Sequence, residues 1–221
     1  MARSKTNRRP SVMLIGAMSL DGKISTRTGE SQISSLRDLR RLHQERGRHS
    51  AVMIGVGTLI HDNPRLTVRH VKGKSPIRII VDSTAKTSPN ARVFSAGRSP
   101  VILAVTSRAS KKRVERLRQA GAYIIQAGKY QVNLRTLMGR LHQLGITSLL
   151  LEGGGELNWS MISNRLVDEV KLTVAPFIVG GRKATTLVDG EGFAKVDHAT
   201  RLIPVSVKRQ NEEVVLTYKV K

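Results

Sequence analysis

Residues 149–158 read LLLEGGGELN: an apolar run, one carboxylate, three glycines and then a helix-forming sequence. The run has the length of a buried strand, and Glu152 is its last residue. Glycines let a backbone come close to a phosphate, and the start of a helix offers free N–H groups and the positive end of its dipole to an anion. The stretch therefore predicts a phosphate-binding turn, with a tight connection that binds no ligand as the alternative.

The chain on both sides of this turn alternates between strand and helix patterns. Short apolar runs predict strands at 11–19, 51–54, 77–81, 101–105, 123–126 and 170–175. Between them, Ser35, Ser107 and Asn133 are expected to cap helices. Ser35 is followed by Asp38 in a capping-box pattern, and the leucines of its helix share one face. Strands at 206–208 and 214–220 end the chain. The prediction is an α/β fold: a mostly parallel sheet flanked by helices, with an antiparallel C-terminal hairpin.

Length and composition limit the possible domain organisation and chemistry of the molecule. The 221 residues predict one domain at 10–221, preceded by a flexible basic arm at 1–9. The absence of cysteine excludes disulfides, thiolate catalysis and Cys-ligated zinc, and fits a cytoplasmic protein. No apolar stretch is long enough to span a membrane, so no membrane partner is expected.

The charge balance leaves two kinds of partner open. The net charge of +22 attracts polyanions, so a basic nucleic-acid-binding protein is one alternative. However, the basic residues are spread along the chain, and three Phe, three Tyr and one Trp are few for a base-stacking surface. We therefore expect nucleic acid to bind only non-specifically through charge. The same charge suits small phosphorylated ligands.

Several predicted strands end in polar or glycine-rich groups. Thr58 with Asp62, Asp82 with Ser83, Gly128, and Glu152 with its glycines would all meet at the carboxyl edge of a parallel sheet, where such folds bind ligands. The first strand lacks the Gly-x-Gly-x-x-Gly spacing of a standard dinucleotide domain, and the chain has no Gly-Lys-Ser/Thr phosphate loop. It also lacks a Gly-x-Ser-x-Gly nucleophile turn and any histidine spacing typical of a metal site. No metal is expected.

Four motifs in order resemble one family. Residues 17–23 (AMSLDGK), 57–69 (GTLIHDNPRLTVR), 79–83 (IIVDS) and 151–158 (LEGGGELN) closely resemble the riboflavin-biosynthesis reductases, as do 166–169 and 174–176. The resemblance runs from about residue 10 to the end. It implies a fold similar to dihydrofolate reductase and a homodimer. In bacterial relatives the reductase is fused to a zinc deaminase whose cysteine signature this chain lacks, so the chain is expected to be of the stand-alone type.

The resemblance also implies a reaction. It is the NADPH-dependent reduction of 2,5-diamino-6-(ribosylamino)pyrimidin-4(3H)-one 5′-phosphate to the ribitylamino product, with NADH as the alternative cofactor. A dihydrofolate reductase-like enzyme that acts on another pterin or pyrimidine is the alternative within the fold. The basic residues on the substrate side favour a phosphorylated substrate instead.

Site residues are carried over by motif. Glu152 and Asp21 are the catalytic candidates. Arg46 and Arg69 suit the 5′-phosphate because a guanidinium binds it bidentately, although Arg46 at a helix end has a solvated alternative. Ser83, with Lys86, is the candidate for the 2′-phosphate of NADPH, and Glu156 is expected to point outward from the pyrophosphate. The predicted substrate-binding residues are Ser31, Arg46, Leu66, Arg69, Glu152 and Lys23. The predicted cofactor-binding residues are Thr58, Asp62, Asp82, Ser83, Thr84, Ala85, Gly128, Gly153, Gly154, Gly155 and Glu156.

Overall fold

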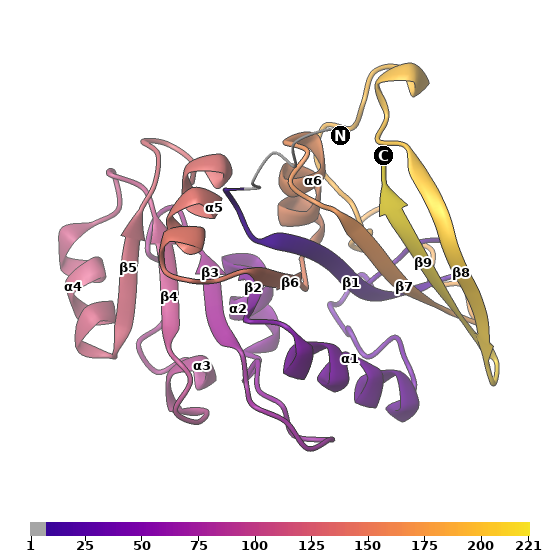
Figure 1. The fold of residues 1–221 in the computed structure, drawn as a ribbon, viewed down its shortest axis with the longest axis horizontal. Coiled ribbons are helices and arrows are strands. Elements are labelled where there is room, and N and C mark those ends of the chain that lie inside the picture. Colours follow the sequence, from indigo (N-terminus) through magenta and orange to yellow (C-terminus); the bar gives the residue numbers. More distant parts are fainter. Residues whose placement is uncertain (1–7) are drawn as a thin grey trace, which may run out of the picture.

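The computed structural model describes residues 8–221, which build one nine-stranded sheet in the order β5-β4-β3-β2-β6-β1-β7-β9-β8 (Figure 1). Strands β1 to β7 pair in parallel, whereas β9 is antiparallel to both β7 and β8. This confirms the predicted sheet and its C-terminal hairpin. The strands are β1 Ser11–Ser19, β2 Ala51–Gly55, β3 Ile77–Val81, β4 Val101–Val105, β5 Ala122–Gln126, β6 Ser148–Leu151, β7 Glu169–Ala175, β8 Leu202–Gln210 and β9 Glu213–Val220.

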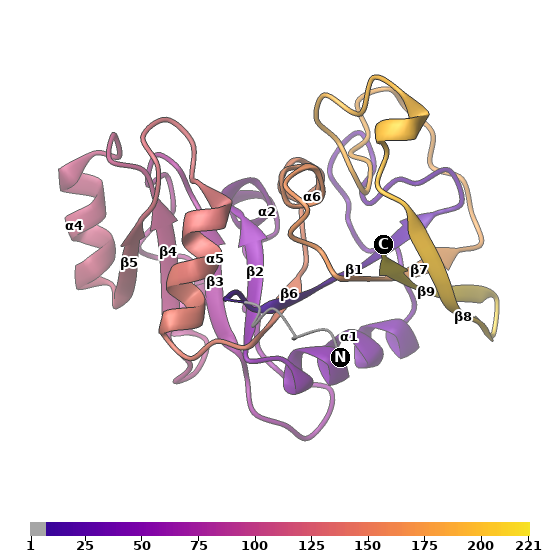
Figure 2. The ribbon, with the colours of Figure 1, turned by 45° about the horizontal axis from the view of Figure 1, so that its top comes forward.

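Helices cover both faces of the sheet (Figure 2). Side chains alternate along each strand, so Ala51 and Met53 of β2 face α5 and α6, whereas Val52 and Ile54 face α2, α3 and α4. Helix α1 lies beside β1 and β7 (Figure 1). No helix in residues 8–221 is long and apolar enough to cross a membrane. The helices are α1 Leu36–Arg48, α2 Val56–Asp62, α3 Arg92–Ser95, α4 Lys111–Gln119, α5 Leu134–Gln143 and α6 Gly155–Ser163, with a 3-10 turn, η1, at Val196–His198.

The predicted elements differ from the structure in a few places. Ser110, not Ser107, caps α4, because its side chain accepts a hydrogen bond from the N–H of Arg113. The hairpin strands are longer than predicted, and the short α3 and η1 have no apolar repeat that could have revealed them. The basic arm expected at 1–9 falls mostly outside the described residues. Its last residue, Arg9, is held by an ion pair with Asp168 at 2.7 and 2.6 Å.

Helix α1 departs most from the sequence-based interpretation. Its leucines are not its most buried residues: Leu36 is 69% exposed and Leu42 is only partly buried. The buried residues are Asp38, His43, Glu45 and Arg46. The polar face packs against β7, where Thr173 donates to Asp38 at 2.5 Å and Lys171 donates to Glu45 at 2.8 Å. The apolar face is thereby turned toward a cavity. This cavity lies at the carboxyl edge of the sheet.

Candidate active site

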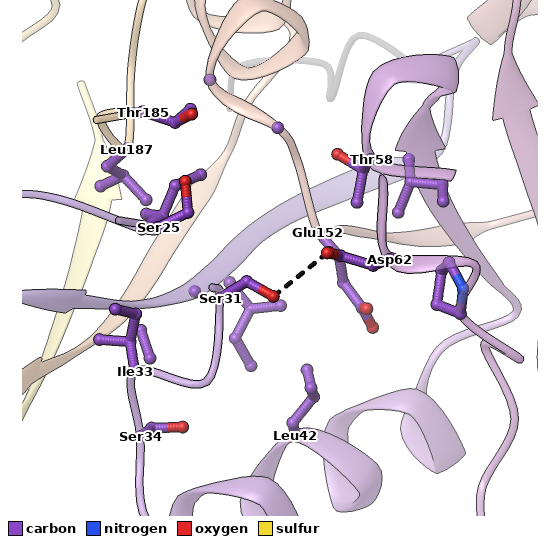
Figure 3. A pocket seen from close by; sticks show the side chains of 18 of the residues that line it. Ser25, Ser31, Ile33, Ser34, Leu42, Thr58, Asp62, Glu152, Thr185 and Leu187 are labelled. Atoms are coloured by element: carbon purple, nitrogen blue, oxygen red, sulfur yellow. Dashed lines mark hydrogen bonds between the residues drawn. The ribbon is translucent and has the colours of Figure 1, made fainter. Parts of the chain in front are cut away.

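A cavity of about 790 Å³ opens at the carboxyl edge of β1, β2 and β6 (Figure 3). Helix α1 forms one side, helix α2 and the first turn of α6 form another, and the loop after β7 closes it with Thr185, Leu187 and Asp189. The structure brings nine of the predicted site residues to its lining. These are Ser31, Arg46, Thr58, Asp62, Leu66, Glu152, Gly154, Gly155 and Glu156.

Glu152 enters this cavity from the end of β6, and Arg46 of α1 holds it in place. Arg46 Nε donates to Glu152 Oε1 and Nη2 donates to Oε2, each at 2.7 Å. The third guanidinium nitrogen donates to the carbonyl of Thr67 at 3.1 Å. Arg46 is only 6% exposed, so the ion pair is shielded from water. Arg46 therefore fixes the orientation of the carboxylate, and its hydrogen-bonding capacity is largely used within the protein.

Ser31 and Asp62 meet on the opposite side of Glu152. The Ser31 hydroxyl donates to Asp62 Oδ1 at 3.2 Å, and the two side chains point toward the same space as Glu152 (Figure 3). Asp62 is the last residue of α2, and Ser31 lies in the segment before α1. Residues predicted for the cofactor and for the substrate are thus in direct contact.

The glycine turn shapes the cavity floor between β6 and α6. Gly55 N donates to Gly153 O at 2.8 Å, and the Gly153–Gly154 peptide bond is cis. A Cβ on Gly154 would lie 3.1 Å from Thr58 Oγ1, so a glycine permits this close approach. No side chain caps the N-terminus of α6. Its free N–H groups and the adjacent Thr58 hydroxyl fit a pyrophosphate. Glu156 beside them is exposed and also lines the cavity, so its outward orientation stays a prediction.

One carboxylate approaches this helix start. A Cβ on Gly155 would overlap Asp189, whose backbone N–H donates to Gly155 O at 3.3 Å. Asp189 is itself bonded by the hydroxyl and N–H of Thr186. The loop after β7 is therefore tied to the first turn of α6, and a phosphate bound there would lie on the side away from Asp189.

The predicted residues at the ends of β3 and β5 lie farther along the edge and do not line this cavity. Asp82 is fully buried and accepts from the N–H and hydroxyl of Thr87 at 2.7 and 2.8 Å. Ser83 Oγ accepts from Val132 N at 3.3 Å. Gly128 has a φ of 86°, and a Cβ there would collide with the backbone of Gln131. Asp82 therefore shapes its turn, and Gly128 is required by its backbone conformation. Their contacts with a cofactor stay predictions, as do those of Thr84, Ala85 and Gly153.

Asp21 and Lys23 also lie away from the lining. Asp21 accepts from the N–H groups of Val179 and Gly180 at 3.0 and 2.8 Å. The hydrogen bond from Ser19, and then that from Val179, lowers the pKa of Asp21 to about 2, so this carboxyl is a poor proton donor at neutral pH. Lys23 donates to Ala184 O at 3.1 Å. Both side chains fasten the loop after β7, and a direct role in the reaction stays a prediction.

Unpaired positive charge gathers next to Arg46. Burial, and then the charges of Arg46, Arg65 and Arg92, lower the pKa of Arg69 from its usual value. Arg69 is exposed and donates to Thr67 Oγ1 at 2.9 Å, outside the cavity lining. Its neighbour His43 is buried and accepts from the N–H of Arg69 at 3.0 Å. This side of the site is electrostatically prepared for an anion.

Sequence reasoning missed the wall contributed by α1 and by the loop after β7. Leu39, Leu42 and Arg41 line the cavity, but their periodicity was typical of a helix packed on a core. Thr185, Leu187 and Asp189 lie in a loop without periodicity, and only their polar composition could have drawn notice.

Comparison with known proteins now identifies the family, since residues 10–216 match the RibD C-terminal domain. The chain belongs to that family. It is 46% identical over 216 residues to a 2,5-diamino-6-ribosylamino-4(3H)-pyrimidinone 5′-phosphate reductase of Methanothermobacter thermautotrophicus, covering 96% of this chain and 99% of the relative. It is 41% identical over 199 residues to an Aquifex aeolicus protein of the same name, covering 88% and 89%.

The fold agrees with solved members of this RibD family. A Thermotoga maritima structure, described as a diaminohydroxyphosphoribosylaminopyrimidine deaminase/5-amino-6-(5-phosphoribosylamino)uracil reductase, superposes with a TM-score of 0.81 at 25% identity. The alignment covers 98% of this chain and 58% of the Thermotoga chain. The resemblance to riboflavin-biosynthesis reductases and the reductase fold are both confirmed.

Proposed function

We propose that the chain reduces 2,5-diamino-6-(ribosylamino)pyrimidin-4(3H)-one 5′-phosphate to its ribitylamino product in riboflavin biosynthesis, with NADPH as the reductant. The observation that carries the proposal is the cavity in which the shielded Glu152–Arg46 pair stands beside the uncapped start of α6. The names of the archaeal and Aquifex relatives, which align over most of their length, support the substrate.

The residues of this chain supply position and charge. NADPH, when bound, supplies the hydride. Glu152 is held by both of its oxygens, so its remaining lone pairs are aimed at a polar group of the substrate without reorganisation. The Ser31–Asp62 pair offers further polar groups on the facing wall. The leucines of α1 contribute an apolar wall to the cavity, which helps to exclude water from a bound substrate.

Of the two arginines expected to bind the 5′-phosphate of the substrate, Arg69 is more available than Arg46. Arg46 has committed all three guanidinium nitrogens to Glu152 and Thr67, so it contributes charge more than new hydrogen bonds. Arg69, with an exposed guanidinium and cationic neighbours, is the better partner for the phosphate. Leu66 holds in place the segment that carries Arg69. Its side chain is only 1% exposed, and its backbone adopts a left-handed conformation with φ of 54°.

The proposal extends to assembly and location. We propose a homodimer in which β8 contributes to the interface, because this edge strand exposes Leu202, Ile203, Val205 and Val207. Such apolar edges are usually covered. The cytoplasmic location expected from the sequence stays a prediction.

The test measures the oxidation of NADPH through the loss of its absorbance, with the ribosylaminopyrimidine phosphate as substrate. We expect substrate-dependent oxidation and a ribitylamino product by mass spectrometry. Glu152→Gln should lower kcat at least tenfold, and Glu212→Gln, an exposed change on the C-terminal hairpin, should leave it unchanged. Absence of turnover by a protein that binds NADPH would overturn the substrate and retain the cofactor. Equal kinetics for Glu152→Gln and the wild type would remove Glu152 from the mechanism.

A further inference from the structure

A second ion pair, between Asp38 and Arg41, lines the main cavity beside the first turns of α1. Arg41 Nε donates to Asp38 Oδ1 at 2.8 Å, and both side chains are largely shielded from water. Asp38 is the one acidic residue of α1 on the cavity lining. The contacts described above for Glu152 and for the phosphate do not use this pair, so its place in the site needs its own explanation.

Each member of the pair keeps one hydrogen-bonding atom unused. Thr173 of β7 donates to Asp38 Oδ1 at 2.5 Å and accepts from Arg41 Nη2 at 2.7 Å, so the strand fixes both side chains. Within residues 8–221, Asp38 Oδ2 accepts no hydrogen bond, and Arg41 Nη1 is buried without an acceptor. Buried polar groups of this kind are costly unless they are paired. The pair therefore offers one acceptor and one donor to a ligand.

The pair lies toward the opposite end of α1 from Arg46. Arg46 follows Asp38 by eight positions, which corresponds to about 12 Å along the helix axis. Arg46 and Arg69 gather positive charge at their end, whereas the carboxylate at the other end repels a phosphate. Leu42, one turn after Asp38 on the same face of α1, points toward the space that Glu152 enters (Figure 3). A substrate whose phosphate lies near Arg69 therefore places its ring beside Asp38.

We propose that Asp38 and Arg41 bind the edge of the pyrimidine ring and select a 2-amino ring over the corresponding 2-oxo ring. The inference rests on the proposed function and names the residues that read its substrate. The diaminopyrimidinone ring carries an amino group at C2 and a carbonyl at C4. Asp38 Oδ2 accepts from the amino group, and Arg41 Nη1 donates to the carbonyl.

A uracil ring differs at the position that Asp38 reads. Its C2 carbonyl places an oxygen against the carboxylate, so Asp38 Oδ2 stays unpaired and the two oxygens repel each other. A buried site that lacks its hydrogen-bonding partner discriminates strongly against such a ligand. The names of the relatives contain both rings: the Methanothermobacter protein is named for the diaminopyrimidinone, whereas the description of the Thermotoga protein names a uracil reductase.

Turnover with two nucleotides that differ only at C2 tests the assignment. The wild type should reduce the diaminopyrimidinone nucleotide with a kcat/KM at least about tenfold above that for 5-amino-6-(ribosylamino)uracil 5′-phosphate. Asp38→Asn should bring this ratio to within about twofold, because an amide also donates to a carbonyl at C2. Arg41→Gln should raise KM for both nucleotides by a similar factor, since both keep the C4 carbonyl. Equal turnover of the two by the wild type, or an unchanged ratio in Asp38→Asn, would overturn the proposal.

Glu45→Gln is the matched control for a purely structural role. Glu45 is a second buried acid of α1, accepts from Lys171 of β7 at 2.8 Å, and lies outside the cavity lining. Its substitution should lower the midpoint of unfolding in urea and keep the wild-type ratio of the two substrates. The same change of ratio in Glu45→Gln and Asp38→Asn would assign the effect to the attachment of α1 to β7, and would overturn the contact of Asp38 with the ring.

Free bases separate this inference from the proposed reaction. 2,6-Diaminopyrimidin-4(3H)-one and 6-aminouracil keep the distinguishing edge but carry no ribose to reduce. In NMR titrations the wild type should bind the diamino base more tightly by about tenfold, and Asp38→Asn should remove the difference. If this preference is found but the nucleotide is not reduced, the reaction of the proposed function fails and the ring site stands. Equal binding of the two bases by the wild type overturns the ring site, even where the nucleotide is reduced.

Discussion

Arg46 and Glu152 join helix α1 to strand β6 through a buried ion pair. Removing one member of such a pair leaves the other charge buried and unpaired, at a cost of about 3–5 kcal/mol. We expect Arg46→Met to lower the free energy of unfolding by that amount in urea titrations. The double variant Arg46→Met/Glu152→Leu should be more stable than Arg46→Met, because no unpaired charge remains. A double variant less stable than Arg46→Met would contradict the assignment of this cost to the unpaired charge of Glu152. All of these variants should lose activity.

His43 makes stability depend on pH. Burial lowers its pKa to about 3, with a smaller effect in the same direction from the charges of Arg46 and Arg69, and its ring packs edge-on against His70 with centroids 4.6 Å apart. The unfolded chain binds a proton near pH 6.5, and the folded chain does not do so until about pH 3. The unfolded state therefore holds more protons between these values, and the free energy of unfolding falls as pH decreases through this window.

Exchange of His43 for Asn removes this titration and keeps an acceptor for the N–H of Arg69. Between pH 7 and pH 5 the wild type should lose about 2 kcal/mol more stability than His43→Asn, since a difference of one proton corresponds to about 1.4 kcal/mol per pH unit. Urea titrations at the two pH values measure both losses. Parallel losses would mean that His43 is protonated in the folded protein.

The sequence could predict those site residues whose position follows from the order of the strands along the chain. Thr58, Asp62 and Glu152 each follow a strand of a parallel sheet, so their shared edge could be inferred from the chain order. The partner of Glu152 could not be inferred, because Arg46 is 106 residues away and only the packing of α1 brings them together. Asp21 shows the converse: it belongs to a family motif, yet it accepts hydrogen bonds from Ser19 at the end of β1 and from the loop after β7, outside the cavity lining.

At the scale of elements, the start of α1 depends on the C-terminal hairpin. The predicted capping box is half correct: Ser35 Oγ accepts from Asp38 N at 3.2 Å, but the N–H of Ser35 donates to Glu213 at 2.7 Å. Asp38 is instead held by Arg41 at 2.8 Å and by Thr173. Periodicity and caps tell which residues share a face of the helix. They do not tell which neighbour that face meets, and here the leucines meet the cavity.

Glu213 should therefore stabilise α1 from a distance of 178 residues in the sequence. Its two oxygens accept from the N–H and hydroxyl of Ser35 at 2.7 and 2.8 Å, and it is 6% exposed. Glu213→Ala should lower the free energy of unfolding by about 1–3 kcal/mol, because buried donors lose their acceptor. The adjacent Glu212→Ala, an exposed change of the same charge, should stay within about 0.5 kcal/mol of the wild type. Equal effects of the two substitutions in urea titrations would contradict this coupling.

For the whole molecule, alternating strands and helices were sufficient to predict the parallel sheet, since each crossover must return the chain to the same edge. The loop after β7 was not predictable. It has no apolar repeat, and its placement depends on particular contacts such as Asp189 with the first turn of α6. This loop completes the cavity, so the fold could be inferred more fully than the shape of the site.

The open edge of the sheet leads to the last prediction. Val205 and Val207 of β8 are 53% and 66% exposed, and the proposed dimer would cover them. Val207→Lys should convert the dimer to monomers in analytical ultracentrifugation, because a buried ammonium group would lose its hydration at the interface. Val196→Lys, an equal change at a valine that is 76% exposed in η1, should leave the dimer intact.

Salt should shift the equilibrium between monomer and dimer in the opposite direction, toward the dimer. Each chain carries a net charge of +22, so two copies repel one another until ions screen the charge. The wild-type dimer should therefore become tighter as salt increases, whereas non-specific binding of duplex DNA should weaken steeply. Val207→Lys should remain monomeric in high salt, since its defect is desolvation at the interface and not long-range repulsion. A monomeric wild type at every salt concentration would show that the apolar edge of β8 does not bind a second copy of the chain.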